Sequence, residues 1–282
     1  MNRWQIKKII QLALEEDIPF EDITTSLLIN ENLKGEALFI AKEPLVICGI
    51  PVVEEVFNFI DPELQLHWFV KEGEEINKPG YLGKVKGKLN SILKGERIAL
   101  NLFQHLSGIA TYTRKVVRKI SRYNAVLVDT RKTLPGLKLL QKYAVRIGGG
   151  KNHRFSLSDG ILIKDNHIKA LGGMDNLAKL LKSIKIPHYL KVEIEVKSLE
   201  ELKILVKQEA PVDVVLLDNF QVEEVKKAVE FLKTQKKSIK IEVSGGINLD
   251  NIEEFAKAGV DYISSGALTH SVKAVDISLK II

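Results

Sequence analysis

The sequence predicts an α/β protein built on a parallel sheet, and three observations carry this prediction. From about residue 125 onward, short apolar runs alternate with stretches whose apolar residues recur at helical spacing. Such alternation of strand and helix gives a parallel sheet covered by helices. Seven strand-like runs favour a seven-stranded, incompletely closed α/β barrel, with an open doubly wound sheet as the alternative. Most of these runs also end in polar residues.

The N-terminal region has a different pattern, which predicts a separate α+β sandwich domain over residues 1–95. We expect helices at residues 3–16 and 51–60 and a strand at residues 35–43. Residues 64–87 alternate polar and apolar positions and are interrupted by Gly and Pro, which is typical of antiparallel strands joined by turns.

A long and mostly apolar helix is predicted at residues 96–120. Because it is too apolar for a solvent-exposed linker, we expect it to be buried between domains or subunits. It forms the connection, residues 96–124, to a barrel over residues 125–282. The last residues of the chain are candidates for packing back on the N-terminal domain.

The predicted barrel strands share aliphatic and β-branched residues, and they are 125–128, 144–147, 160–163, 189–194, 213–217, 239–243 and 261–264. The predicted helices between them are 137–143, 172–184, 198–209, 222–233 and 248–259. Leu199, Leu202, Leu205 and Val206 illustrate the helical spacing.

Composition excludes several classes of protein. The 282 residues are 45% hydrophobic and 28% charged, with a net charge of +6, which is ordinary for a globular chain. The lysines are dispersed and rarely adjoin aromatic residues, so we expect a small anionic substrate and no nucleic acid. A single cysteine, Cys48, excludes an internal disulfide. No run reaches the roughly 20 apolar residues of a membrane span, and the N-terminus is amphipathic, so we expect a cytoplasmic protein.

Cations follow the early strands of the predicted barrel. Active sites of such barrels lie at the carboxyl ends of the strands. These ends carry Arg131, Lys132, Arg154 and Lys164, with Thr130 and His153 beside them. Each pair of cations about 6 Å apart would repel by roughly 2–3 kcal/mol at an effective dielectric near 20. Lysine and arginine usually lie on a solvated surface, but an anionic substrate would remove this repulsion.

Carboxylates follow the middle strands. Glu195 and Asp218 could pair with the cations, bind Mg²⁺, bond ribose hydroxyls or stabilise a developing positive charge. Glu193 shares the face of Glu195 by strand periodicity but lies deeper, and we expect a structural role for it.

Small residues follow the last strands. Ser244, Gly245 and Gly246 precede a predicted helix, and Ser265 and Gly266 end the next strand. Backbone N–H groups and a helix N-terminus there could hold a phosphate, although glycines can also simply make a tight turn. None of the six histidines has a zinc-ligand spacing, so no zinc site is expected, and the role of His270 stays open.

Eight segments in order resemble the quinolinate phosphoribosyltransferase family. They are "ERIALNLFQHLSGIAT", "DTRKTLPGL", "KYAVRIGGGKNHR", "ILIKDNHI", "VEIEV", "LLDNF", "SGGI" and "VDYISSGALTHS". The resemblance implies transfer of phosphoribosyl from phosphoribosyl pyrophosphate to quinolinate with decarboxylation, giving nicotinate mononucleotide, pyrophosphate and CO₂ for NAD biosynthesis. It also implies a homodimer or larger homo-oligomer with shared active sites.

The resemblance further implies roles for individual residues. Substrate would contact Thr130, Arg131, Lys132, His153, Arg154 and Lys164, and Arg97 from a partner subunit. Lys132, Glu195 and Asp218 would be catalytic, and the two acids would hold Mg²⁺ with the substrate. The phosphate would bind Ser244, Gly245, Gly246, Ser265 and Gly266. No organic cofactor is implied. A related transferase acting on another base and a non-catalytic phosphosugar-binding barrel are the alternatives.

Overall fold

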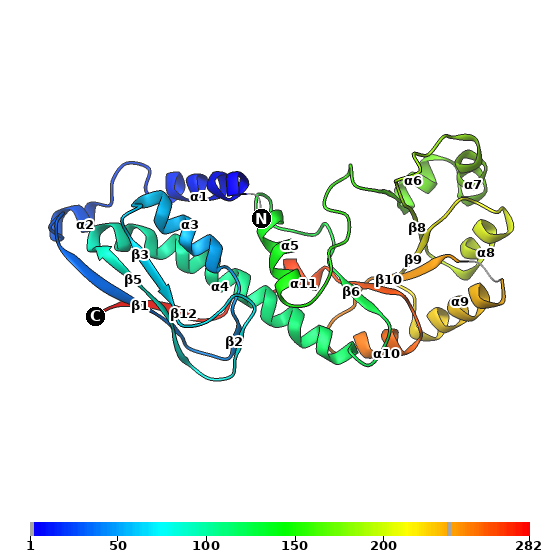
Figure 1. Ribbon diagram of the computed structural model, residues 1–282. Coiled ribbons are helices and arrows are strands. Elements are labelled where there is room, and N and C mark those ends of the chain that lie inside the picture. Colours follow the sequence, from blue (N-terminus) through cyan, green and yellow to red (C-terminus); the bar gives the residue numbers. More distant parts are fainter. Residues whose placement is uncertain (1–2, 236–237) are drawn as a thin grey trace. The chain divides into compact units, whose positions relative to one another are not determined.

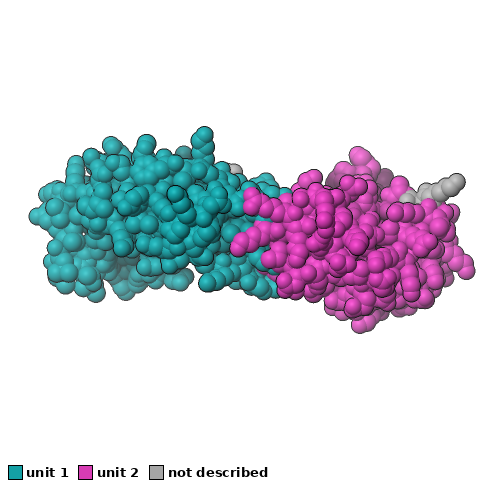
Figure 2. Space-filling model, turned by 90° about the horizontal axis from the view of Figure 1, so that it is seen from below, with its two compact units in different colours: residues 1–114, 133–149, 268–282 teal, residues 115–132, 150–267 magenta. Residues whose placement is uncertain are grey.

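A computed structural model describes residues 3–235 and 238–282. The chain divides into two compact units, coloured separately in Figure 2. Unit 1 contains Met1–Arg114, Thr133–Gly149 and Leu268–Ile282, and unit 2 contains Lys115–Lys132 and Gly150–Ala267. These units are less continuous along the chain than the expected domains 1–95 and 125–282, because two later segments belong to unit 1.

Unit 1 is built on a four-stranded antiparallel sheet in the order β12-β1-β5-β3. Its strands are β1 (Lys34–Ala41), β3 (Gln65–Trp68), β5 (Gly80–Lys88) and β12 (Ile277–Ile281). A small separate pair consists of β2 (Leu45–Val46) and β4 (Glu75–Ile76). The helices within it are α1 (Arg3–Asp17), α2 (Ile23–Leu28), α3 (Ile50–Ile60) and α5 (Lys138–Ile147).

Aromatic side chains form the core of unit 1. Phe39 of β1 meets Phe57 of α3 and Phe103 of α4 (Leu89–Ile120), each with ring centroids 6.2 Å apart. Both helices therefore cover the same face of the sheet. The C-terminal strand β12 pairs antiparallel with β1, so the end of the chain belongs to the sheet of unit 1.

Unit 2 is built on a parallel sheet in the order β6-β11-β10-β9-β8-β7. Its strands are β6 (Val126–Val128), β7 (Ile161–Ile163), β8 (Val192–Val196), β9 (Val214–Asp218), β10 (Lys240–Ser244) and β11 (Tyr262–Ser264). The helices between them are α6 (Asp165–Ala170), α7 (Met174–Ser183), α8 (Leu199–Lys207), α9 (Val222–Thr234) and α10 (Ile252–Lys257), and the short α11 (Ala267–His270) follows β11 (Figure 1).

Three strands of unit 2, β8, β9 and β10, carry polar residues on the face opposite their buried aliphatic residues. Ile194, Val215 and Val243 are buried, and alternate with Glu195, Asp218 and Ser244. Because successive strand residues point to opposite faces, the apolar set faces the helices and the polar set faces inward. This alternation places Glu195, Asp218 and Ser244 on the face of the sheet opposite the buried aliphatic residues.

The expected strand at residues 144–147 is wrong, because these residues form the second half of α5. Leu140 and Ala144 lie four residues apart and are both buried, so the apolar spacing of one helix runs on until Gly148 caps it. The sheet of unit 2 consequently has six strands within the described residues, not seven. At the outer edge of β6, one isolated parallel bridge joins Val128 to Lys151.

No helix within residues 3–235 and 238–282 is long and apolar enough to cross a membrane. Even α4, with 32 residues, carries charged residues along its length.

Candidate active site

A cavity of about 570 Å³ lies within unit 2, at the carboxyl ends of its strands. It brings together most of the residues that the sequence singled out. They are Thr130, Arg131, Lys132, His153, Arg154, Lys164, Glu195, Asp218, Ser244, Gly245 and Gly246. These residues come from six separate segments, and the parallel order of the strands is what places their ends at one opening.

Cations occupy one part of the cavity. Arg131, Lys132 and Lys164 are exposed, whereas Arg154 is partly buried. Burial and then the charge of Arg131 lower the pKa of the Arg154 guanidinium. Arg154 Nη1 donates to the Gly160 carbonyl at 3.0 Å, but its Nε is buried without an acceptor among the described residues. This arrangement favours an anionic ligand, which would supply the missing acceptor.

The two acids come from neighbouring strands. Glu195 is 7% exposed, its Oε2 lies 3.4 Å from Lys164 Nζ, and its Oε1 accepts from the Asp165 N–H at 3.3 Å. Asp218 ends β9, and its Oδ2 accepts from Asn219 Nδ2 at 2.8 Å. Both acids line the cavity, and Glu195 does so directly beside Lys164.

The backbone conformation of the turn after β10 favours glycine at both of its positions. Gly245 has φ +97° and Gly246 has φ +60°. A Cβ on Gly245 would collide with the side chain and backbone of Asn219. The expectation that this turn opens a helix is wrong: the predicted helix 248–259 begins only at Ile252, so the turn offers backbone N–H groups without a helix N-terminus.

Three predicted site residues do not line the cavity. Ser265 is buried, and its Oγ donates to the Ile247 carbonyl at 2.7 Å, so it ties the ends of β10 and β11 together. Gly266 follows it, and Ser264 takes the lining position instead. Arg97 belongs to unit 1, where it lines a separate cavity with Asp22.

The sequence reasoning missed Glu242, which lines the cavity from the middle of β10 and is 4% exposed. It lies two residues before Ser244, on the same face of the strand. That spacing could have indicated Glu242. It lies inside the predicted strand 239–243, however, and not at the strand end where site residues were expected.

His153 is held by hydrogen bonds on both ring nitrogens. Its Nδ1 accepts from the Arg154 backbone N–H at 2.7 Å, and its Nε2 lies 2.9 Å from Glu193 Oε2. Asp129 accepts from the His153 N–H at 2.9 Å and fixes this segment beside β6. Two other histidines do not line this cavity. His167 Nδ1 accepts from the Lys164 N–H at 2.9 Å, and His270 lies on α11 in unit 1.

The donor set of the cavity suits Mg²⁺ bound together with a phosphorylated ligand. Mg²⁺ takes hard oxygen ligands and commonly uses one or two carboxylates plus substrate phosphates. Glu195 and Asp218 present carboxylate oxygens beside the glycine turn. Within the described residues, Glu195 and Asp218 are not part of a compact cluster of three metal-ligating side chains. The one such cluster in that part of the chain consists of His153, Glu193 and Glu242, which lies deeper.

The fold and the cavity define an α/β protein whose parallel strands end at a cavity lined by cations, carboxylates and a glycine turn. Comparisons with known proteins narrow this class. Residues 22–107 match the model of the quinolinate phosphoribosyl transferase N-terminal domain, and residues 109–280 match that of the C-terminal domain.

Relatives in sequence and structure agree with these matches. A protein of Methanocaldococcus jannaschii, named probable nicotinate-nucleotide pyrophosphorylase (carboxylating), is 44% identical over 98% of this chain and 96% of its own. A Bacillus subtilis protein of the same name is 40% identical over 100% and 95%. The solved nicotinate-nucleotide pyrophosphorylase of Francisella tularensis has a TM-score of 0.91 and 39% identity, covering 100% of this chain and 98% of its own. The chain belongs to the quinolinate phosphoribosyltransferase family.

Proposed function

We propose that this chain transfers the phosphoribosyl group of phosphoribosyl pyrophosphate to quinolinate and releases pyrophosphate and CO₂, which leaves nicotinate mononucleotide. One observation carries the proposal: cations, two acids and a glycine turn line a single cavity within unit 2. The names of the relatives, which belong to nicotinate-nucleotide pyrophosphorylases (carboxylating), support the same reaction.

The cations have a defined task in this reaction. Quinolinate is a dicarboxylate, and Arg131, Arg154 and Lys164 bind its two carboxylates. Lys132 and His153 lie beside them, and Thr130 lines the same wall. Fixing both carboxylates orients the ring nitrogen toward C1′ of the ribose, which converts an encounter of two anions into an ordered attack.

The acids and the glycine turn act on the sugar. Positive charge develops on the ribose as pyrophosphate leaves, and Glu195 and Asp218 stabilise it. The N–H groups of Gly245 and Gly246, with Ser244, hold the 5′-phosphate. Ser265 supports this turn through its hydrogen bond to the Ile247 carbonyl, and Gly266 follows it. Mg²⁺, bound by Glu195 and Asp218 together with the donor, would stabilise the charge of the leaving pyrophosphate.

The second bond change needs no organic cofactor. Once the ring nitrogen carries the ribose, it is a pyridinium and withdraws electrons from the adjacent carbon. The carboxylate on that carbon leaves as CO₂, and the ring itself accepts the electron pair.

The oligomeric state and the place of Arg97 extend the proposal. We expect a cytoplasmic homodimer or larger assembly in which Arg97 of one subunit reaches the cavity of another. Trp4, Leu12, Leu27 and Leu28 are exposed apolar residues of unit 1 that such an interface would cover. We also expect the sheet of unit 2 to form an incompletely closed barrel, with Lys151 marking the position of a seventh strand beside β6.

Product analysis tests the reaction. The protein is incubated with quinolinate, phosphoribosyl pyrophosphate and Mg²⁺, and nicotinate mononucleotide, pyrophosphate and CO₂ are measured. A parallel incubation replaces quinolinate with nicotinate. We expect turnover with quinolinate only. Turnover of another base would favour a related transferase, and binding without turnover would favour a phosphosugar-binding protein.

A mixing experiment tests the shared site. Arg97→Ala and Lys164→Ala should each be nearly inactive alone. After dissociation and reassembly together, a shared site predicts recovery of about a quarter of the wild-type activity, because half of the subunit pairs are mixed and one site in each is intact. No recovery in confirmed mixed assemblies would contradict the role of Arg97.

A further inference from the structure

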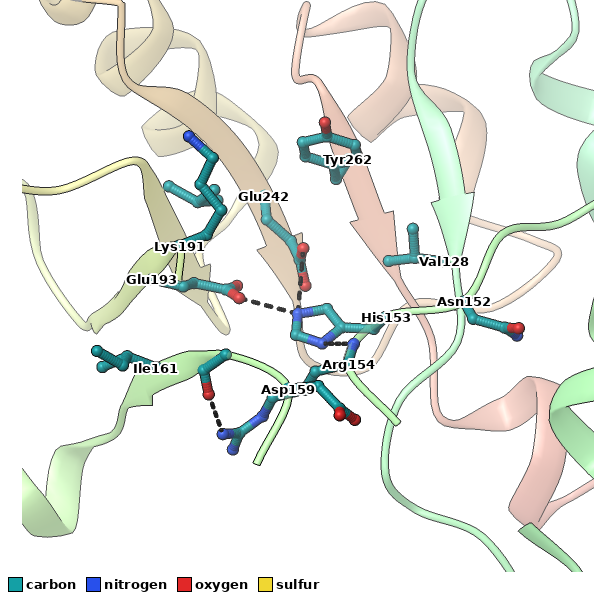
Figure 3. Close-up of a pocket in the computed structure, with 12 residues that line it drawn as sticks. Val128, Asn152, His153, Arg154, Asp159, Ile161, Lys191, Glu193, Glu242 and Tyr262 are labelled. Atoms are coloured by element: carbon teal, nitrogen blue, oxygen red, sulfur yellow. Dashed lines mark hydrogen bonds and ion pairs between the residues drawn. The ribbon is translucent and has the colours of Figure 1, made fainter. Parts of the chain in front are cut away.

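Two buried acids and a half-buried histidine meet on the floor of the cavity, and we call His153, Glu193 and Glu242 the floor cluster. Figure 3 shows one nitrogen of the His153 ring facing the carboxylates of both Glu193 and Glu242. His153 Nε2 lies 2.9 Å from Glu193 Oε2 and 3.7 Å from Glu242 Oε2. Glu193 and Glu242 are 7% and 4% exposed, so both acids are almost entirely removed from water. Isolated charges at such depth are costly unless a proton or a partner neutralises them.

The floor cluster separates two cavities. The active-site cavity is lined by His153, Arg154 and Glu242, and the same three residues line a second cavity of about 260 Å³. Val214 and Tyr262, the first residues of β9 and β11, line the second cavity together with Lys191, which directly precedes β8. The second cavity therefore lies toward the amino ends of the strands, on the opposite side of the floor cluster from the substrate.

The hydrogen bonds assign the protons of the floor cluster. His153 Nδ1 accepts a backbone N–H, so the ring proton is on Nε2, which faces the acids. This single N–H faces two carboxylates. Burial, followed by the charge of Glu193, raises the pKa of Glu242 to about 7, while His153, Ser264 and Lys164 act in the opposite direction. Glu193 Oε1 is buried and accepts no hydrogen bond within the described residues.

The reaction proposed above requires a proton at a specific atom. When CO₂ leaves, the electron pair of the broken C–C bond stays on ring carbon 2. That carbon must gain one proton to give the product, and an acid on the pocket wall can deliver it. Glu242 lines the active-site cavity, and its raised pKa lets it keep a proton near neutral pH.

We propose that Glu242 is the acid that protonates ring carbon 2 of the substrate as CO₂ leaves, and that Glu193 and His153 are its positioning residues. This inference rests on the proposed function. The carboxyl O–H of Glu242 breaks, its proton forms the new C–H bond, and the Glu242 carboxylate remains. Water that enters the second cavity returns a proton to it, since Glu242 lines both sides.

Single-turnover kinetics of Glu242→Gln test the inference. Glutamine keeps the shape of the side chain but has no carboxyl proton. Without the acid, the carbanion takes CO₂ back, so we expect pyrophosphate release within a few-fold of wild type and CO₂ release about 10²-fold slower. Quinolinate mononucleotide, the product of the first bond change, should accumulate in the interval.

The control is Glu55→Gln, which removes a buried carboxylate that pairs with Arg3 in unit 1. We expect it to release pyrophosphate and CO₂ together, as the wild type does. If Glu242→Gln also releases both products together, at whatever rate, the inference is overturned, because a purely structural role slows both steps alike.

A second variant covers the case in which Glu242→Gln does not fold. Glu242→Asp keeps an acid but withdraws it from the pocket, and it should show a smaller lag of CO₂ behind pyrophosphate. The wild type should also show a solvent deuterium isotope effect on CO₂ release that is absent from pyrophosphate release; equal effects on both would count against Glu242. Failure of the wild type to form nicotinate mononucleotide would instead overturn the proposed function, so the two failures are distinguishable.

Discussion

At the mouth of the cavity, the Lys164 side chain is 51% exposed, whereas on the floor the Glu242 side chain is 6% exposed. Lys164 directly follows β7 and Glu242 lies within β10, and both line the active-site cavity. The mouth, which we define as Arg131, Lys132, Lys164, Glu195 and Asp218, has three exposed cations and a half-buried Asp218, whereas Glu195 is buried beside Lys164. Solvated charges attract ligands over distance and are screened by salt.

Charge on the floor acts differently because water does not screen it. A buried acid responds to its surroundings by changing its protonation, as Glu242 does when burial and Glu193 raise its pKa to about 7. The mouth should therefore control substrate binding and the first bond change. The floor cluster should control proton supply and the pH dependence of the protein.

The largest expected effect tests whether cations govern binding. Arg154→Ala removes the guanidinium whose Nε is buried without an acceptor among the described residues. We expect kcat/KM for quinolinate to fall about 10²–10³-fold, since charge-assisted and bidentate hydrogen bonds to a carboxylate are lost. Steady-state kinetics with varied quinolinate measure this.

Arg131→Ala should also lower kcat/KM for quinolinate. Circular dichroism should confirm that both variants are folded. Lys257→Ala, an exposed cation at the end of α10, is the matched control and should leave the kinetics unchanged. Wild-type kinetics in both arginine variants would remove the assignment of the cations to the substrate.

The second effect concerns the acids of the mouth. Glu195→Gln removes the negative charge that faces Lys164 at 3.4 Å and leaves that lysine without its carboxylate. We expect kcat to fall about 10²-fold, as when one preorganised electrostatic group is removed from a transition state. Pyrophosphate release should slow as much as CO₂ release, in contrast with Glu242→Gln. A lag of CO₂ behind pyrophosphate in Glu195→Gln would contradict the division between mouth and floor.

Much of the mouth could be predicted from the sequence, because its residues lie at or near the carboxyl ends of strands. Arg131 and Lys164 follow strands, Glu195 and Asp218 lie in the last two positions of theirs, and parallel strands bring such ends to one edge. Local sequence order is sufficient for that inference. It was not sufficient at residues 144–147, where a short apolar run continued a helix instead of beginning a strand.

The floor cluster could not be predicted in the same way. Glu193 and Glu242 lie inside strands, and their partner His153 comes from a segment 40 residues before Glu193. Histidine spacing along the chain gave no sign of this cluster, since its members meet only when the sheet forms. The glycine turn was predicted correctly, since Gly245 and Gly246 both have positive φ. The helix expected directly after it was not, because α10 begins only at Ile252.

A smaller effect tests the glycine turn as the phosphate site. At Gly245 a Cβ would meet Asn219, and φ is +97°, so Gly245→Ala should displace the turn. We expect KM for phosphoribosyl pyrophosphate to rise about tenfold, with a lesser change for quinolinate, because strain of this kind costs about 1–3 kcal/mol. Gly246→Ala, where a Cβ meets nothing within 4 Å, should change this KM less. Gly259→Ala has φ +90° outside the cavity and should alter stability alone.

The smallest effect is on thermal stability and depends on pH through the floor cluster. Because the folded protein raises the pKa of Glu242 from 4.5 to about 7, the native state holds a proton there that the unfolded chain releases. The contribution of Glu242 to stability is therefore complete below about pH 4.5 and is lost as the pH rises through about 7. The full loss corresponds to at most about 3 kcal/mol. Glu242→Gln removes this dependence, so its melting temperature should exceed that of the wild type by a few degrees more at pH 8 than at pH 5. Thermal unfolding of both proteins at the two pH values measures the difference. An equal difference at both values would mean that Glu242 holds no proton in the folded protein, and the contrast between mouth and floor would then rest on exposure alone.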